Sequence, residues 1–267
     1  MKLYLAFLTN EFQSNLAYKT DVLLKMFGRV MGLFVQIALW TALYGTTSGT
    51  AATGMGQISL NDMINYVVIS TCISVFVSNN TIFSIGDKIR SGDIGLQLMK
   101  PISLQTCMLF QSMGTSASRI FFELAPLIVV AAIFYPLTVP PVHLLLPFAV
   151  ALLNGFVLNF LLAYILGMVG FWYINIYHLS RLLSDVIKVF SGVWIPLWFF
   201  PQILTDISAF LPFRLIYFSP ISIYMGKTEW TDTLLLIAQQ FMWIGILLLV
   251  AELVWRKGIS KLVIQGG

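Results

Sequence analysis

Charged residues are scarce in this sequence. Only 10% of its 267 residues are charged, whereas 58% are hydrophobic. An average soluble domain carries about 25% charged residues. A soluble fold could not cover this much apolar surface, so the composition excludes an ordinary soluble domain and indicates a protein that is embedded in a membrane.

Residues that build reactive centres are also rare. There are two cysteines, and Cys72 lies in an apolar run, which argues against a disulfide framework or a metal cluster. His143 and His178 fall in expected loops on opposite sides of the membrane and so could not share a site. The phosphate-binding patterns GxxxxGKS and GxxxxGKT do not occur. We therefore expect a chain that is not an enzyme, with no catalytic site and no metal, and any ATP must be bound by another chain.

Long apolar runs dominate what remains. A membrane-spanning helix needs about 20 mostly apolar residues to cross roughly 30 Å of hydrocarbon. Lys25 and Arg29, near the start of the first run, are expected to extend to the lipid headgroups. Five runs meet the length requirement: Val22 to Tyr44, Met63 to Ile85, Ile120 to Leu137, Val142 to Tyr173 and Thr233 to Trp255.

The distribution of basic residues predicts the topology. The links 45–61 and 138–141 contain no Lys or Arg, and all 15 basic residues except Arg214 and Lys227 fall in the alternate segments. Because basic residues favour the cytoplasmic side, both termini are expected in the cytoplasm. The chain after the fourth run must then cross twice, which predicts an additional span from Leu182 to Phe200 and six spans in all.

The segment 202–226, before the last span, is too apolar for a solvated loop and is interrupted by Pro212 and Pro220. We expect it to form two short helices that enter the outer leaflet and return, a re-entrant hairpin whose backbone is covered by protein. The alternative is a Pro-kinked additional span, which would place the basic C-terminus outside.

Residues 1–21 carry apolar and aromatic side chains at helical spacing, which predicts an amphipathic helix on the inner membrane surface. The alternative is a simple extension of the first span. Asn10 and Glu11 come too early for the apolar core of a signal peptide, so this segment is expected to remain on the mature protein.

Few ionisable residues lie inside the expected spans. Arg119 and Glu123 are four residues apart and are expected to form an ion pair on one helix face. The alternative is that Glu123 relays protons. Glu252 and Arg256 repeat the same spacing at the end of the last span.

The segment 84–103 is the most informative hydrophilic stretch. It combines charges of both signs with three glycines and with the apolar residues Ile89, Ile94, Leu96 and Leu98. Such a pattern could form a short amphipathic helix that docks on a soluble partner. An ordinary interfacial loop is the alternative.

Three stretches of the sequence are familiar: IRSGDIGLQLMKPIS, GVWIPLWFFPQILTDISAFLPFRLIYFSPISIYMG and RKGISKLVIQGG. In this order they resemble the ABC-2 type permeases, specifically the members with six spans and no ATPase domain. The resemblance implies an all-α membrane protein with an interfacial helix over 1–21, a membrane domain over 22–255 and a cytoplasmic tail over 256–267. The first, second and fifth spans are expected to line the pathway.

The resemblance also implies partners and site residues. Two cytoplasmic ABC ATPase subunits would bind ATP and Mg, a second permease subunit would be identical or homologous, and no nucleic acid is expected. The segment that couples to the ATPase would comprise Asp87, Lys88, Ile89, Arg90, Ser91, Gly92, Asp93, Ile94 and Gly95. The outer gate would comprise Pro196, Trp198, Phe199, Phe200, Pro201, Pro212, Pro220 and Gly226.

We therefore expect the permease subunit of an ATP-driven exporter in the cytoplasmic (inner) membrane. The aromatic residues Trp194, Trp198, Phe199 and Phe200 favour an amphipathic or hydrophobic substrate such as a drug, an antibiotic, a peptide or a lipid-linked molecule. An interfacial aromatic belt is the alternative explanation for them. The rival functions are an ATPase-independent secondary transporter or channel, and a membrane scaffold that transports nothing.

Overall fold

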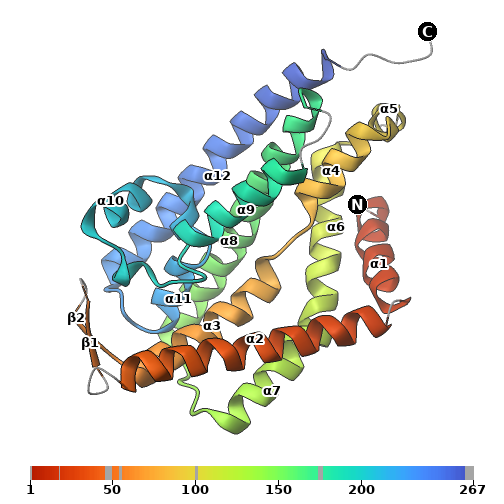
Figure 1. Cartoon of the computed structure of the whole chain (residues 1–267). Coiled ribbons are helices and arrows are strands. Elements are labelled where there is room, and N and C mark those ends of the chain that lie inside the picture. The colour runs from red at the N-terminus through yellow and green to blue at the C-terminus, as the bar shows by residue number, and fades with distance from the viewer. Residues whose placement is uncertain are drawn as a thin grey trace.

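The computed structural model describes residues 2–17, 19–45, 50–53, 56–99, 102–173 and 177–261. These residues are almost entirely helical, with one antiparallel hairpin of strands β1 (Thr50–Thr53) and β2 (Gly56–Ser59) (Figure 1). Five helices are long and apolar enough to cross a membrane. This confirms the expected all-α membrane fold.

The candidate spans follow the order of the apolar runs. They are α2 (Lys19–Gly45), α3 (Leu60–Val77) with α4 (Thr81–Arg90), α6 (Leu104–Arg119) with α7 (Ala125–Phe134), α8 (Val142–Met168) and α12 (Trp230–Ile259). The shorter helices are α1 (Lys2–Ala17), α5 (Asp93–Leu98), α9 (Tyr177–Phe190), α10 (Gln202–Phe210) and α11 (Phe218–Tyr224). The end of α12 and helix α5 lie at one end of the molecule, opposite the β hairpin and the end of α7 (Figure 1).

The third span begins at Leu104, well before the expected start at Ile120. Hydropathy did not identify α6 because several of its small and polar residues face protein instead of lipid. Ser112, Ser116 and Ser118 are buried, and Ser112 Oγ lies 3.0 Å from Thr81 Oγ1 at the start of α4. Small and hydroxyl-bearing residues commonly occupy helix contacts within a membrane.

The expected helical span from Leu182 to Phe200 is wrong as a single helix. Helix α9 ends at Phe190, and Gly192 has φ +81°, a left-handed conformation that helical residues do not adopt. The chain between α8 and α12 nevertheless runs back from one end of the molecule to the other. This follows because α8 and α12 lie side by side and run in the same direction. Gln240 contacts Ala151 near one end of this pair, and Trp255 contacts Phe171 at the other. Two parallel neighbours require the intervening chain to cross back.

Helix α10 and the segment Pro212–Tyr224 form a pair that is bent by 78°. The start of the second segment is held by Gln240 of α12, which is fully buried. Its Nε2 donates to the carbonyl oxygens of Leu215 and Ala151, at 2.9 Å each, and its Oε1 accepts from Asn154 Nδ2 at 3.3 Å. A bent segment inside a bilayer requires this kind of internal partner for its freed carbonyls.

Helix α8 approaches the same segment closely at Gly155. A Cβ atom there would lie 2.7 Å from the carbonyl oxygen of Ile216, a contact too short for any side chain. The bent pair therefore lies directly on the backbone of α8.

Helix α1 runs alongside α6 and turns away from α2 (Figure 1). The Phe12 ring meets the Phe121 ring edge to face, with centroids 6.3 Å apart. The two N-terminal helices therefore do not form one continuous span. The expected segment 1–21 contains α1 and the first residues of α2, and residues 262–267 of the expected tail lie outside the described residues.

We predict that Gln240→Leu destabilises the protein. The substitution removes the side-chain donor of the Leu215 and Ala151 carbonyls; Ala151 keeps its partner within α8, whereas the Leu215 carbonyl is orphaned, and an orphaned buried group costs about 1–3 kcal/mol. The melting temperature of the purified protein should fall by roughly 4 to 8 °C. Gln239→Leu is the matched control, because Gln239 Oε1 has no hydrogen-bond partner in the described structure. An equal loss of stability in both variants would contradict the role given to Gln240.

Candidate functional site

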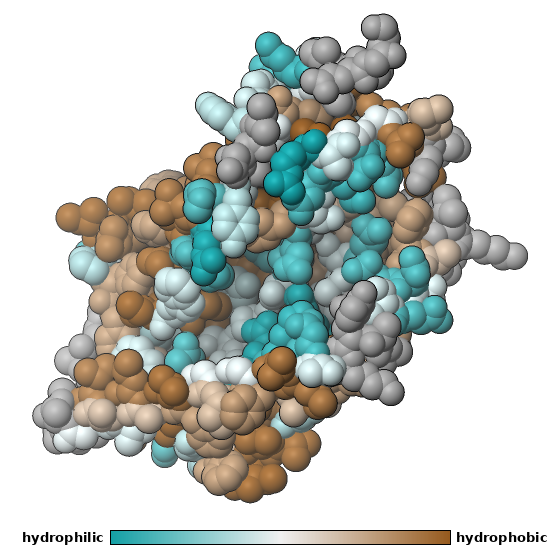
Figure 2. Space-filling model, turned by 45° about the vertical axis from the view of Figure 1, so that its right-hand side comes forward, coloured by the Kyte–Doolittle hydropathy of each residue, from teal (hydrophilic) through white to brown (hydrophobic). Residues whose placement is uncertain are grey.

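A cavity of about 530 Å³ opens between α2, α3 and the turn that follows α9. Hydrophilic residues gather in a band down the middle of one face of the molecule, between hydrophobic rims (Figure 2). The cavity takes residues from four parts of the chain: Lys25, Gly28, Arg29, Gly32, Leu33 and Gln36 of α2, Ser70, Thr71, Ser74, Ser78 and Asn80 in and after α3, Arg119 and Glu123, and Val193 and Trp194 after α9.

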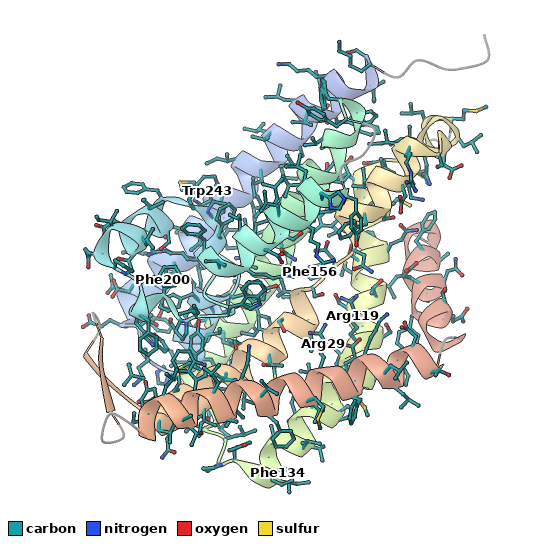
Figure 3. The ribbon with its side chains drawn as sticks, in the orientation of Figure 1. Arg29, Arg119, Phe134, Phe156, Phe200 and Trp243 are labelled. Carbon is teal, nitrogen blue, oxygen red and sulfur yellow. The ribbon has the colours of Figure 1, made fainter. Side chains whose placement is uncertain are left out.

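Glu123 is the centre of the charged part of this lining. Its Oε2 atom lies 2.6 Å from Nε of Arg29, and its Oε1 atom lies 3.9 Å from Nε of Arg119. The Glu123 side chain is only 5% exposed, whereas that of Arg29 is 29% exposed. Arg29 and Arg119 lie near each other between α2 and α6 (Figure 3). A single buried carboxylate thus bridges two guanidinium groups.

The expectation that Arg29 reaches the lipid headgroups is wrong. Its side chain turns inward to Glu123, 94 residues away in sequence, and lines the cavity. Lys25 also lines the cavity and pairs with Asp21 at 2.5 Å. An arginine inside an apolar run was the available signal, because such residues commonly mark functional sites, but its partner could not be identified from sequence.

Glu123 lies within a π-helical turn, Ile120–Leu124, which joins α6 to α7. Such turns are rare, insert one extra residue into the helix and often occur at functional sites. The turn has no distinctive sequence signal, and the expected span contained none.

The second span is interrupted at residues 78–80, between α3 and α4. Side chains from neighbouring helices satisfy the carbonyl groups that this interruption frees. Ser116 Oγ donates to the Phe76 carbonyl at 2.8 Å, Asn159 Nδ2 donates to the Val77 carbonyl at 2.9 Å, and Arg119 Nη1 donates to the Ser78 carbonyl and to Ser78 Oγ. Arg119 therefore contacts both the interruption and the carboxylate of the cavity.

The expected coupling residues, Asp87 to Gly95, lie at the end of α4 and the start of α5. Asp87 and Arg90 form an exposed pair at 3.1 Å, and Gly92 has φ +79°, which permits the tight turn between the helices. Ile94 is fully buried, whereas Leu96 and Met99 are 63% and 82% exposed. The apolar residues of the segment therefore split between the protein interior and the surface. Lys100 and Pro101 lie outside the described residues.

The residues expected at the outer gate differ in burial. Pro196, Trp198, Pro212 and Pro220 are buried, Phe199 and Phe200 are partly buried, and Pro201 and Gly226 are exposed.

Two of the expected gate residues join an aromatic cluster. Trp198 packs edge to face on Tyr66 of α3, with ring centroids 4.7 Å apart, and Phe199 stacks on Trp40 of α2 at 5.2 Å. Tyr66 also donates from its hydroxyl to the Gly192 carbonyl at 2.7 Å. This cluster connects α2, α3 and the chain after α9 beyond the charged part of the cavity. Sequence reasoning did not identify Trp40 or Tyr66.

The model of a family described as ABC-2 family transporter protein matches residues 30–266 of the chain. The match includes the coupling segment, the bent pair and most of the cavity lining, whereas Lys25, Gly28 and Arg29 precede it. A search of curated proteins found no match.

Proposed function

The chain belongs to the ABC-2 family of transporter proteins, and on this premise we propose that it is the membrane-spanning permease subunit of an ATP-driven exporter. It moves an amphipathic or hydrophobic substrate across the cytoplasmic membrane by alternating access. The observation that carries the proposal is the cavity of about 530 Å³, whose lining contacts the interruption of the second span. The complex contains two ABC ATPase subunits that bind ATP and Mg, and a second permease subunit, identical or homologous.

The surface of α4 and α5 supports a docking role for this segment. It combines an exposed apolar group, Leu96 and Met99, with the exposed charges of Asp87, Arg90 and Asp93. Apolar contacts supply affinity and surrounding charges supply orientation in interfaces of this kind. The segment lies at the same end of the molecule as the end of α12, which is the cytoplasmic end in this proposal (Figure 1).

Movement of α4 reaches the cavity through the interruption at residues 78–80. Helix α4 is short and continues directly to α5, so a force on the docked segment displaces it relative to α3. The side chain of Arg119 spans the interruption and the cavity, with hydrogen bonds to Ser78 on one side and an ion pair with Glu123 at 3.9 Å on the other. ATP-driven motion of α4 therefore changes the position of charged groups in the cavity wall.

The aromatic cluster of Trp40, Tyr66, Trp198 and Phe199 closes the far end of the pathway. Packed aromatic rings exclude water and ions until the helices that carry them separate. Because the cluster joins α2, α3 and the chain after α9, relative motion of these elements opens it.

Reconstitution tests the proposal directly. Proteoliposomes with the permease and a candidate ABC ATPase should export a fluorescent amphiphilic dye only when both proteins and ATP are present. Dye movement without the ATPase would instead support a secondary transporter or channel. Complete absence of movement with an ATPase that binds and hydrolyses ATP would support a scaffold.

We predict that replacing Arg90 and Asp93 by Ala weakens ATPase binding about tenfold, because both exposed charges are lost from the docking surface. Co-purification with the ATPase and stimulated ATP hydrolysis measure the effect. Arg256→Ala is the matched control, since Arg256 is exposed and pairs with Glu252 at 2.6 Å near the same end of the molecule. Unchanged ATPase binding in the double variant would refute the docking role.

A second variant tests whether Arg119 transmits the movement of α4 to the cavity. Arg119→Gln removes the guanidinium that joins Ser78 to Glu123, so the complex should assemble and hydrolyse ATP but transport about tenfold less substrate per ATP. Arg119→Lys should retain only part of the coupling, because an ammonium group lacks the planar fork of donors. Equal losses of hydrolysis and transport would contradict a specific role in transmission.

A further inference from the structure

The cavity carries an excess of positive charge. Among the described residues that line it, three are cationic, Lys25, Arg29 and Arg119, and one, Glu123, is a carboxylate. Lys25 has its own partner in Asp21. Arg29 and Arg119 therefore share one carboxylate, which leaves one positive charge uncompensated in a cavity that lies between candidate spans. The nearby charges of α9 also pair with each other, Lys188 with Asp185 at 3.0 Å.

The guanidinium of Arg29 has free donor capacity. Its ion pair with Glu123 uses Nε, and within the described structure neither terminal nitrogen has a hydrogen-bond partner. Two terminal N–H groups in one plane match the oxygens of a phosphate or a carboxylate. An uncompensated cation surrounded by low-dielectric protein is unfavourable, and an anionic ligand would remove this cost.

The wall of the cavity on α2 is also open beside two glycines. Gly28 and Gly32 line the cavity one helical turn apart, and apart from the neighbouring backbone of α2 no atom lies within 4 Å of the position that a Cβ would occupy at either residue. On the outer surface of the same helix, Phe27, Met31 and Val35 are exposed at successive turns. A polar headgroup could therefore occupy the cavity while an apolar tail lies along α2. Trp194, which is 47% exposed, adds an aromatic surface to the opposite wall.

From these observations we propose that the cavity binds an amphiphile with an anionic headgroup, a phosphate or carboxylate that Arg29 contacts directly. This assigns the substrate class of the exporter and so rests on the proposed function. A cationic amphiphile would meet the uncompensated positive charge and bind weakly. Arg29 precedes the part of the chain that matches the family, whereas Arg119 and Glu123 lie within it.

The binding test uses the purified permease in nanodiscs of zwitterionic lipid, without an ATPase. Three matched probes, pyrene-labelled dodecyl chains that end in a carboxylate, an alcohol or an ammonium group, are titrated by fluorescence anisotropy. The carboxylate probe should bind about tenfold more tightly than the alcohol, and the ammonium probe should bind most weakly. Equal affinity for all three probes would overturn the proposal.

Substitutions of Arg29 and of Glu123 are expected to change the affinity for the carboxylate probe in opposite directions. Arg29→Gln should weaken binding of the carboxylate probe about tenfold, whereas Glu123→Gln should strengthen it, because it removes the competing carboxylate. Arg256→Gln, outside the cavity, should change nothing. If Glu123→Gln weakened binding as much as Arg29→Gln, the charged group would be only a structural unit and the proposal would fail. If Glu123→Gln does not fold, Arg29→Lys replaces it as the second variant and must retain the preference for the carboxylate probe.

A further experiment distinguishes a bilayer lipid from a soluble amphiphile as the ligand of the cavity. In nanodiscs that contain phosphatidylglycerol, competition with the carboxylate probe would show that a bilayer lipid occupies the site. Lack of competition would count against a phospholipid headgroup and would leave the carboxylate amphiphile from solution as the ligand. Since no ATPase is present, failure of ATP-driven transport would refute the proposed function without affecting this measurement.

Discussion

Backbone groups inside a bilayer have no water to bind, so every irregular turn at membrane depth needs an internal partner. This constraint determines much of the architecture. The segment between α10 and α11 depends on Gln240 of α12, and the interruption of the second span depends on Ser116, Asn159 and Arg119. In each case, the side chain that satisfies the carbonyl belongs to another helix. The irregular segments are therefore also the places where distant helices are joined.

The charged group of the cavity follows the same principle. Glu123 would be costly to bury alone, and the guanidinium groups of Arg29 and Arg119 compensate its charge. Arg119 serves two purposes, because its remaining donors satisfy Ser78 at the interruption of the second span. The small and polar residues that form the cavity wall, including Gly28, Gly32 and Ser74, keep the space open beside these charges.

Much of the fold could be predicted from the sequence, because hydropathy reports how much apolar surface a segment must bury. It located α2, α8 and α12 closely, but it missed α6, whose serines face protein, and it extended a span through Gly192, where the backbone is left-handed. The cavity could be predicted only in part. The spacing of Arg119 and Glu123 was visible, but the contact of Arg29 with Glu123 joins residues 94 positions apart, which no local pattern reveals.

The shared use of Arg119 has an energetic consequence. The Arg119 guanidinium links the wall of the cavity to the joint between α3 and α4, the interruption at residues 78–80. A ligand in the cavity and the angle between α3 and α4 therefore affect each other. Thermodynamic linkage makes such an effect reciprocal. A cargo that draws Arg119 away from Ser78 must favour a changed joint, and a changed joint must alter the affinity for that cargo by the same factor. In the proposed transporter, cargo binding and the position of α4 are therefore coupled through this one side chain.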